Sequence, residues 1–360
     1  MKANRANGRR KGALARDTKP SRLFGILGVI AVFFVSLGVG RFFSHNNSSS
    51  PPASENPAPK LPRTFAELIA LQPKDLEGTE IALMNLLCAD GLPGAENLNV
   101  DECLATLDRW ARHVKSETDR NHHRFQEDRA YYYNSEAFYK MLMMAVVVYE
   151  DFGVRYNPKW IAPPSEIRGD DHFFADSRDI LIHGMLGPER MGTCSSMPIL
   201  YIALGRRLGY PLKLVSTKQH LFMRWDSPTE KFDMDATGKG LDHYEDDHYK
   251  KWPFPVGEDE IRENGYLKSM TTAEELSVFL TIRGACLTEA GRLAEATLTF
   301  RSACLREPNW RGNQVLFVEA QDRQSQTELA LRRLQVNQGS AHMPADPNPL
   351  RQIKTPTGTP

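Results

Sequence analysis

The chain has 360 residues, of which 41% are hydrophobic, so it is long enough and apolar enough to bury a sizeable core. Lys plus Arg and Asp plus Glu each total 45, and the resulting net charge of zero excludes a globally basic protein built for nucleic acid. Composition therefore predicts a globular protein.

The N-terminal region predicts a single membrane anchor. Residues 1–22 hold eight bases against one acid, and the uncharged run LFGILGVIAVFFVSLGVG follows at once. As a helix this run spans roughly 27 Å, close to the hydrocarbon thickness of about 30 Å. A cleaved secretory signal is the alternative, but the run is long and lacks an A-x-A-like site. We predict a basic cytoplasmic tail over 1–22 and a transmembrane helix over 23–43. The rest of the chain is then outside the cytoplasm, which is the periplasm in a Gram-negative-type bacterium.

Two segments of different composition follow the anchor. Residues 44–63 are rich in Ser, Pro and Asn and cannot bury enough apolar surface to fold, so they are predicted to be a disordered linker. Residues 64–160 show helical periodicity and contain the apolar segment SEAFYKMLMMAVVVYEDFG, where Ser135 is the expected N-cap and Gly153 the expected end. We predict a helical N-terminal part.

Residues 161–270 predict a core that combines a helix with a sheet. A short helix over 176–186 precedes an apolar helix from Cys194 to Leu208, which Pro211 cannot continue. The pattern then changes to three strands, PLKLVST, HLFMRWD and EKFDMDA. A helical part followed by an antiparallel sheet is an α+β layout.

Three residues of this core could form a catalytic triad with a thiol nucleophile. Cys194 opens the apolar helix, whose N-terminal amides and dipole favour a thiolate and stabilise an oxyanion. His220 begins the second strand and Asp235 ends the third, so adjacent antiparallel strands bring the base and its orienting carboxylate together. Gln219 precedes His220, and strand alternation predicts its side chain on the opposite face.

The motifs around Cys194, His220 and Asp235 are specific enough to indicate a family. G-x-C opening a helix that ends in RRLGYP, then H-x-x-x-R-W, then a strand ending in D-A-T-G, resemble the core motif of the transglutaminase-like superfamily, which is papain-like in fold. The resemblance covers roughly residues 64 to 310. It implies Cys194 as nucleophile, His220 as base, Asp235 as orienter and Trp225 as a wall of the substrate groove.

The resemblance also implies a class of reaction. Members transfer or hydrolyse acyl groups at peptide or isopeptide bonds of protein or peptide substrates, and neither a metal nor an organic cofactor is expected. Some members have lost activity, so a catalytically inactive binding or scaffold module at the membrane is the alternative.

The C-terminal part, residues 271–336, predicts helices. Between Ser277 and Trp310, small, aromatic and terminating residues fall where a tetratricopeptide (TPR) repeat places them, namely Leu280, Gly284, Ala296, Phe300, Ala303 and Pro308. This TPR-like segment resembles the bacterial branch of the superfamily that carries such helices, and it implies a protein partner. Residues 337–360 are rich in Pro, Gly and Thr and are predicted to be a disordered tail.

Two further residue sets leave alternatives open. Five cysteines are an odd number, so at least one thiol is unpaired, while Cys286 and Cys304 either form a disulfide or pack as small hydrophobes. His243 and His248 enclose two aspartates, but they lack the HExxH arrangement and lie in an acidic segment read as a solvated loop, so no metal site is predicted.

Overall fold

The computed structural model describes residues 61–161, 172–236 and 242–340, with side chains up to residue 335. The predicted cytoplasmic tail, transmembrane helix and linker up to residue 60 lie outside the described residues, as does the predicted tail beyond residue 340. Within the described ranges, no helix is long and apolar enough to cross a membrane. The described residues fall in one compact unit, which mixes helices and sheet.

The N-terminal part is helical and forms much of the core behind the sheet. Its elements are α1 (Phe65–Ala70), α2 (Pro73–Leu76), α3 (Ile81–Ala89), α4 (Val100–Arg120), α5 (His122–Glu127), η1 (Ala130–Tyr132), α6 (Glu136–Val146), the π-helical η2 (Val147–Asp151), β1 (Arg155–Tyr156) and η3 (Pro158–Trp160). The predicted cap of α6 is confirmed, because the Phe138 N–H donates to Ser135 Oγ at 2.9 Å. Helix α3 is buried along its whole length, so it lies at the centre of the core.

The middle of the chain contains the sheet. Its elements are α7 (Ser177–Ile180), α8 (His183–Leu186), β2 (Met191–Gly192), α9 (Met197–Arg207), β3 (Leu212–Thr217), β4 (His220–Asp226), β5 (Lys231–Asp235), β6 (Asp242–Tyr244), α10 (Asp246–Tyr249) and α11 (Glu258–Asn264). The predicted helix over 176–186 is two short helices, because Leu181 is extended, with φ of −122° and ψ of 156°. The three predicted strands are confirmed, and β6 adds a fourth to an antiparallel sheet of order β3-β4-β5-β6.

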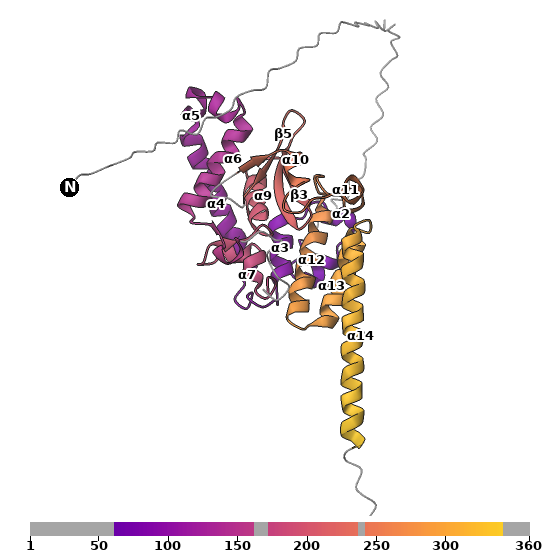
Figure 1. Ribbon diagram of the computed structural model, residues 1–360. Helices are drawn as coiled ribbons and strands as arrows, with labels where there is room; N and C mark the ends of the chain where they lie inside the picture. The colour runs from indigo at the N-terminus through magenta and orange to yellow at the C-terminus, as the bar shows by residue number, and fades with distance from the viewer. Residues whose placement is uncertain (1–60, 162–171, 237–241, 341–360) are drawn as a thin grey trace, which may run out of the picture. The chain divides into compact units, whose positions relative to one another are not determined.

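The sheet has two different faces. Leu214 and Met223 pair across β3 and β4 and belong to the main core together with α9, whose residues are buried from Met197 to Gly205. Figure 1 shows α9 beside β3. On the other face, Val215 and Phe222 form a smaller cluster with Tyr249 of α10. Helix α9 therefore fixes one face of the hairpin that carries His220.

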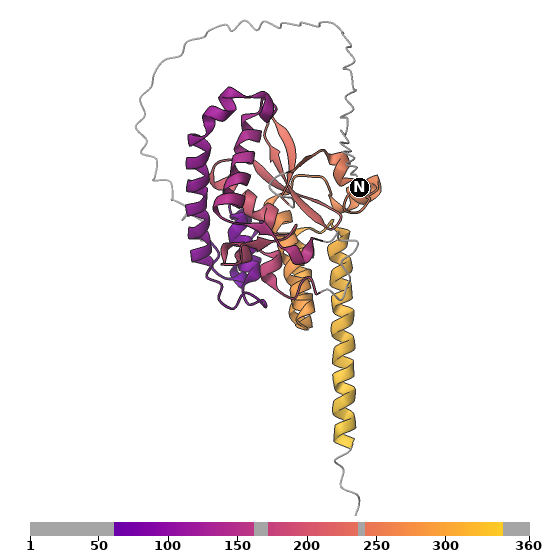
Figure 2. The same cartoon turned by 60° about the vertical axis from the view of Figure 1, so that its left-hand side comes forward.

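Three helices complete the chain: α12 (Thr272–Glu289), α13 (Leu293–Arg306) and α14 (Arg311–Ser340). Helices α12 and α13 pack closely, since a Cβ added to Gly284 would lie 2.6 Å from the Phe300 ring. In Figures 1 and 2, α14 starts beside this pair and extends well beyond it. Helix α14 also continues to Ser340, into the stretch predicted as tail. Assignment of these helices to the TPR family stays a prediction.

Candidate active site

The loop that carries Cys194 is tied to its surroundings by several hydrogen bonds. The Thr193 hydroxyl donates to the Asp179 carbonyl at 2.9 Å, and the Thr193 N–H donates to Ser196 Oγ at 3.0 Å. Gly192 fits because a Cβ there would lie 2.5 Å from the Met185 sulfur. These contacts leave the half-buried Cys194 facing a cavity.

The predicted start of the helix at Cys194 is wrong. Helix α9 begins at Met197, and residues 194–196 form a turn ahead of it. The Met197 N–H closes this turn by donating to the Thr193 carbonyl at 2.9 Å, whereas Pro198 has no N–H to donate to the Cys194 carbonyl, so the helical series of bonds is interrupted there. Cys194 therefore lies just outside the helix rather than in its first turn.

His220 and Asp235 meet at one end of the sheet. Because Met223 is paired with Met234, strand alternation puts both residues on the same face. His220 Nε2 lies 2.6 Å from Asp235 Oδ2, and each side chain is only 1% exposed. The hairpin register thus joins an imidazole and a carboxylate inside the protein.

The charge state of His220 follows from this contact. Burial alone lowers its pKa, but the charge of Asp235 and hydrogen bonds with Asp235 and Cys194 outweigh burial and raise the pKa to about 9. Because Nε2 contacts Asp235, Nδ1 is the ring nitrogen that is left to exchange a proton with the Cys194 thiol. The structure therefore brings Cys194, His220 and Asp235 together in the order in which a thiol, a base and an orienting group must lie.

Aromatic residues enclose the His220–Asp235 contact. The Trp252 ring meets His220 edge-on at 4.7 Å, and the buried Tyr249 stacks on Phe222 at 3.7 Å. Burial and then the charge of Asp235 raise the pKa of Tyr249, so its phenol stays neutral beside the carboxylate. This enclosure keeps water from the ion pair and strengthens it.

Tyr156 is a site residue that the sequence did not reveal. It lies on β1, paired with Gly192 of β2, and lines the same cavity as Cys194. Burial and then the charge of Cys194 raise the pKa of Tyr156, whereas a hydrogen bond from the Cys194 backbone N–H lowers it. Its hydroxyl is thus neutral and close to both the sulfur and the amide of Cys194. A two-residue strand has no period that could have marked it.

Asp179 connects the nucleophile loop to the cavity wall. Its carboxylate accepts from Asn157 Nδ2 at 2.8 Å and from Trp160 Nε1 at 2.9 Å, while its carbonyl accepts from the Thr193 hydroxyl. One residue therefore positions both a wall of the cavity and the turn before Cys194.

The cavity in front of Cys194 has a volume of about 500 Å³, within the usual range for ligand sites. Its lining is mostly apolar and aromatic, and comprises Tyr156, Trp160, Phe173, Phe174, Cys194, Ser195, Ser216, Thr217, Gln219, His220, Leu221, Tyr266, Val278, Thr281, Ile282, Glu289 and Trp310. Thiol and imidazole thus open into a space large enough for a substrate group.

The expectation for Trp225 needs correction. Trp225 is absent from the lining and stacks on its cross-strand partner Phe232 at 5.9 Å. It is five positions after His220, and strand alternation puts residues at an odd spacing on opposite faces. Trp160 and Trp310 wall the cavity in its place.

Gln219 also differs from the expectation. It lines the cavity instead of facing away from His220, because it lies in the turn before β4 with a φ of +60°. Strand alternation does not apply to a turn residue, so the predicted orientation is wrong.

Other candidate residues have structural roles. In the H-x-x-x-R-W motif, Arg224 is buried and donates to Asp233 at 2.8 Å and to Asp246 at 2.6 Å. His243 lies on β6 and His248 on α10, so the segment expected to be a solvated loop is structured by pairing with β5. Among the residues that the structure describes, no group of three His, Cys, Asp or Glu could hold a metal ion.

The remaining thiols lie outside the cavity. All five cysteines are free, so Cys286 and Cys304 are not bridged. Burial raises the pKa of Cys88 and of Cys286 to about 12 and that of Cys103 to about 11. These thiols resist ionisation, and none of them lines the cavity.

One family model matches part of the chain. The family described as Transglutaminase-like superfamily matches residues 101–275, a span that includes Cys194, His220 and Asp235. No curated protein and no solved structure matches the chain. The chain therefore contains a transglutaminase-like domain, which supports either a papain-like thiol enzyme or a scaffold.

Proposed function

We propose that this protein is a thiol enzyme that transfers or hydrolyses acyl groups at peptide or isopeptide bonds. Cys194 is the nucleophile, His220 the general base and Asp235 the group that orients the imidazole. The observation that carries the proposal is the buried 2.6 Å contact between His220 and Asp235 at a cavity that Cys194 also lines. A base oriented in this way activates a neighbouring thiol.

The proposed reaction has two balanced steps. The thiolate sulfur attacks the carbonyl carbon, and the C–N bond then breaks while the His220 imidazolium gives its proton to the departing amine. Water or an amine next attacks the thioester, its proton passes to His220, and the C–S bond breaks to release Cys194. The oxyanion of each intermediate requires donors, for which the Cys194 N–H and the Tyr156 hydroxyl are candidates.

We also propose that the domain works at a membrane and outside the cytoplasm. The support is the basic tail and the uncharged run over 23–40. A reporter that is active only outside the cytoplasm, fused after Pro62, should give a signal. Activity of a reporter that works only in the cytoplasm would overturn this topology.

Alkylation of the full-length protein by iodoacetamide tests the thiol mechanism. Peptide mass spectrometry would follow labelling of Cys194 between pH 5 and 10 in the wild type and in His220→Asn, with Cys304 as the internal reference thiol. We expect Cys194 to react at pH 6 at least about 10-fold faster than Cys304, and to lose this advantage in His220→Asn. Wild-type labelling that follows an ordinary thiol pKa of about 8.5 would instead support the binding or scaffold module.

A further inference from the structure

The cavity in front of Cys194 has one wall from outside the family-matched domain. Val278, Thr281, Ile282 and Glu289 of α12, together with Trp310 ahead of α14, line it, and all five follow residue 275. Thr281 and Ile282 follow Val278 by three and four positions, so these three residues lie on one face of the helix. The C-terminal helices therefore form part of the site and do not merely follow it.

This wall is rigidly attached. Arg283 of α12 donates to the carbonyls of Cys88 and Asp90 at 2.9 and 2.6 Å, and Arg206 of α9 donates to Glu275 at 3.0 Å. On the other side, Asn313 Nδ2 donates to Ser277 Oγ at 2.7 Å. Helix α12 is thus fixed to the core and to α14, and the cavity is formed before any ligand binds.

Another part of the lining is aromatic. The rings of Trp160 and Phe173 meet edge-on at 4.8 Å, and Phe173 and Phe174 do the same at 5.0 Å. A ligand group that contacts these rings and the side chains of Val278 and Ile282 would meet mainly carbon there. Such surroundings favour a bulky apolar or aromatic group.

The charges of the lining exclude acidic groups. None of the described lining residues is Lys or Arg, and the His220 imidazolium is already paired with Asp235, so a carboxylate in the cavity would be buried without a cation of its own. Glu289 is paired with His172. A negatively charged side chain would also meet the like charge of Glu289.

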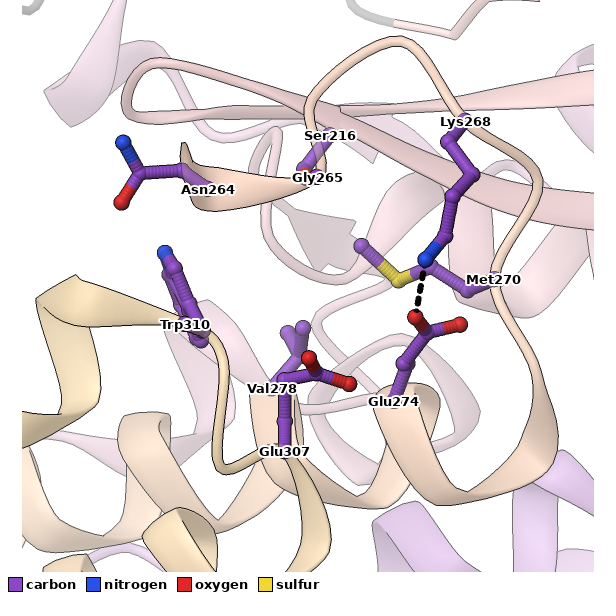
Figure 3. A pocket seen from close by; sticks show the side chains of 9 residues that line it. All are labelled: Ser216, Asn264, Gly265, Lys268, Met270, Glu274, Val278, Glu307 and Trp310. Carbon is purple, nitrogen blue, oxygen red and sulfur yellow. Dashed lines mark ion pairs between the residues drawn. The ribbon is translucent and has the colours of Figure 1, made fainter. Parts of the chain in front are cut away.

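Trp310 limits the depth of the cavity. Ser216, Val278 and Trp310 line both this cavity and a second one of about 30 Å³ behind them. Figure 3 shows Trp310 on one side of the smaller space and the Lys268–Glu274 ion pair on the other. The three shared residues therefore separate the apolar cavity from a charged compartment.

We propose that the C-terminal helices select the substrate, and that the group presented to Cys194 carries a bulky apolar side chain, whereas acidic side chains are rejected. This inference rests on the proposed function for the statement that the occupant is an acyl substrate. The selectivity of the cavity can nevertheless be measured without turnover.

The test uses three alkylating probes on the full-length protein: iodoacetamide, N-(2-phenylethyl)iodoacetamide and N-(2-carboxyethyl)iodoacetamide. Rates at Cys194 are divided by the rates with glutathione, which removes intrinsic reactivity. We expect the phenylethyl probe to react about 10-fold faster than the carboxyethyl probe or better. In Ile282→Asn this ratio should fall to within about 3-fold, because the wall becomes polar. Leu298→Asn, an exposed change on α13 away from the cavity, is the matched control and should keep the wild-type ratio.

Val278→Thr nearly conserves shape and provides a second variant if Ile282→Asn does not fold; it should lower the same ratio. Equal normalised rates for the two probes in the wild type, or an unchanged ratio in both folded variants, would overturn the inference. The two proposals fail separately, because the ratio compares probes at one thiol. If the phenylethyl probe is strongly preferred but labelling of Cys194 does not depend on His220, the selectivity of the cavity is supported and the proposed thiol mechanism is contradicted.

Discussion

The two walls of the cavity are built by different physical means. The wall from the matched domain holds Cys194, His220 and Asp235 through directed polar contacts, such as the 2.6 Å contact of His220 with Asp235. The wall from α12 presents Val278 and Ile282, which contribute shape and apolar surface. The proposals therefore assign reactivity and selectivity to separate parts of the chain, so that a change in one wall should alter one of these properties and leave the other.

The largest effect is expected for Asp235→Asn. The amide removes the negative charge that favours the His220 imidazolium, so alkylation of Cys194 by iodoacetamide at pH 6 should slow by about 100-fold or more. Asp233→Asn is the matched control, since it removes a carboxylate from the same strand that pairs with Arg224 instead. Equal losses in the two variants would assign the effect to general damage of the sheet.

The wall that holds His220 should make the free energy of unfolding depend on pH, whereas the apolar wall from α12 should not. The pKa of His220 is raised to about 9 in the folded protein, so its contribution is fully present below its unfolded value of about 6.5 and is lost as pH rises through 9. Urea unfolding of the wild type and His220→Gln should differ by about 3 kcal/mol more at pH 6 than at pH 10. A difference that does not change with pH would show that His220 contributes packing alone.

The Phe300 ring of α13 packs directly against Gly284 of α12, and Gly284→Ala should disturb this packing. The added Cβ would lie 2.6 Å from the Phe300 ring, so α12 and α13 must separate or the ring must move. We expect about 1–3 kcal/mol of destabilisation, measured by urea unfolding, with partial rescue by Phe300→Leu in the double variant. Because α12 carries the selectivity wall, the ratio of phenylethyl to carboxyethyl labelling should fall as well. A stability loss without rescue would indicate that the ring is not the obstacle.

Sequence predicted the parts of the site that depend on local pattern. His220 and Asp235 could be placed because period-two alternation and the Ser227-Pro228 turn fix the register of β4 and β5. The parts of the site that the sequence did not predict depend on tertiary packing. Tyr156 reaches Cys194 through a two-residue strand, and the wall of α12 is distant from Cys194 in the chain, so no local pattern could indicate either.

The smallest effect is expected for Tyr156→Phe, which tests a polar contact within the wall that carries the nucleophile. The Tyr156 phenol remains neutral because burial and the Cys194 charge raise its pKa. If its hydroxyl donates to the thiolate, the phenylalanine variant should alkylate about 3- to 10-fold more slowly, and its pH profile should move upward. Stability should change little, since the ring is retained.

Alkylation also distinguishes the two roles available to this hydroxyl. Displacement of iodide by the thiolate forms no oxyanion, whereas attack on an amide or ester does. An unchanged alkylation profile with slower acyl transfer would therefore assign the Tyr156 hydroxyl to the oxyanion, while equal losses in both reactions assign it to the thiolate. Faster acyl transfer would contradict both roles, because the hydroxyl would then occupy the place at the Cys194 N–H that the substrate oxygen needs.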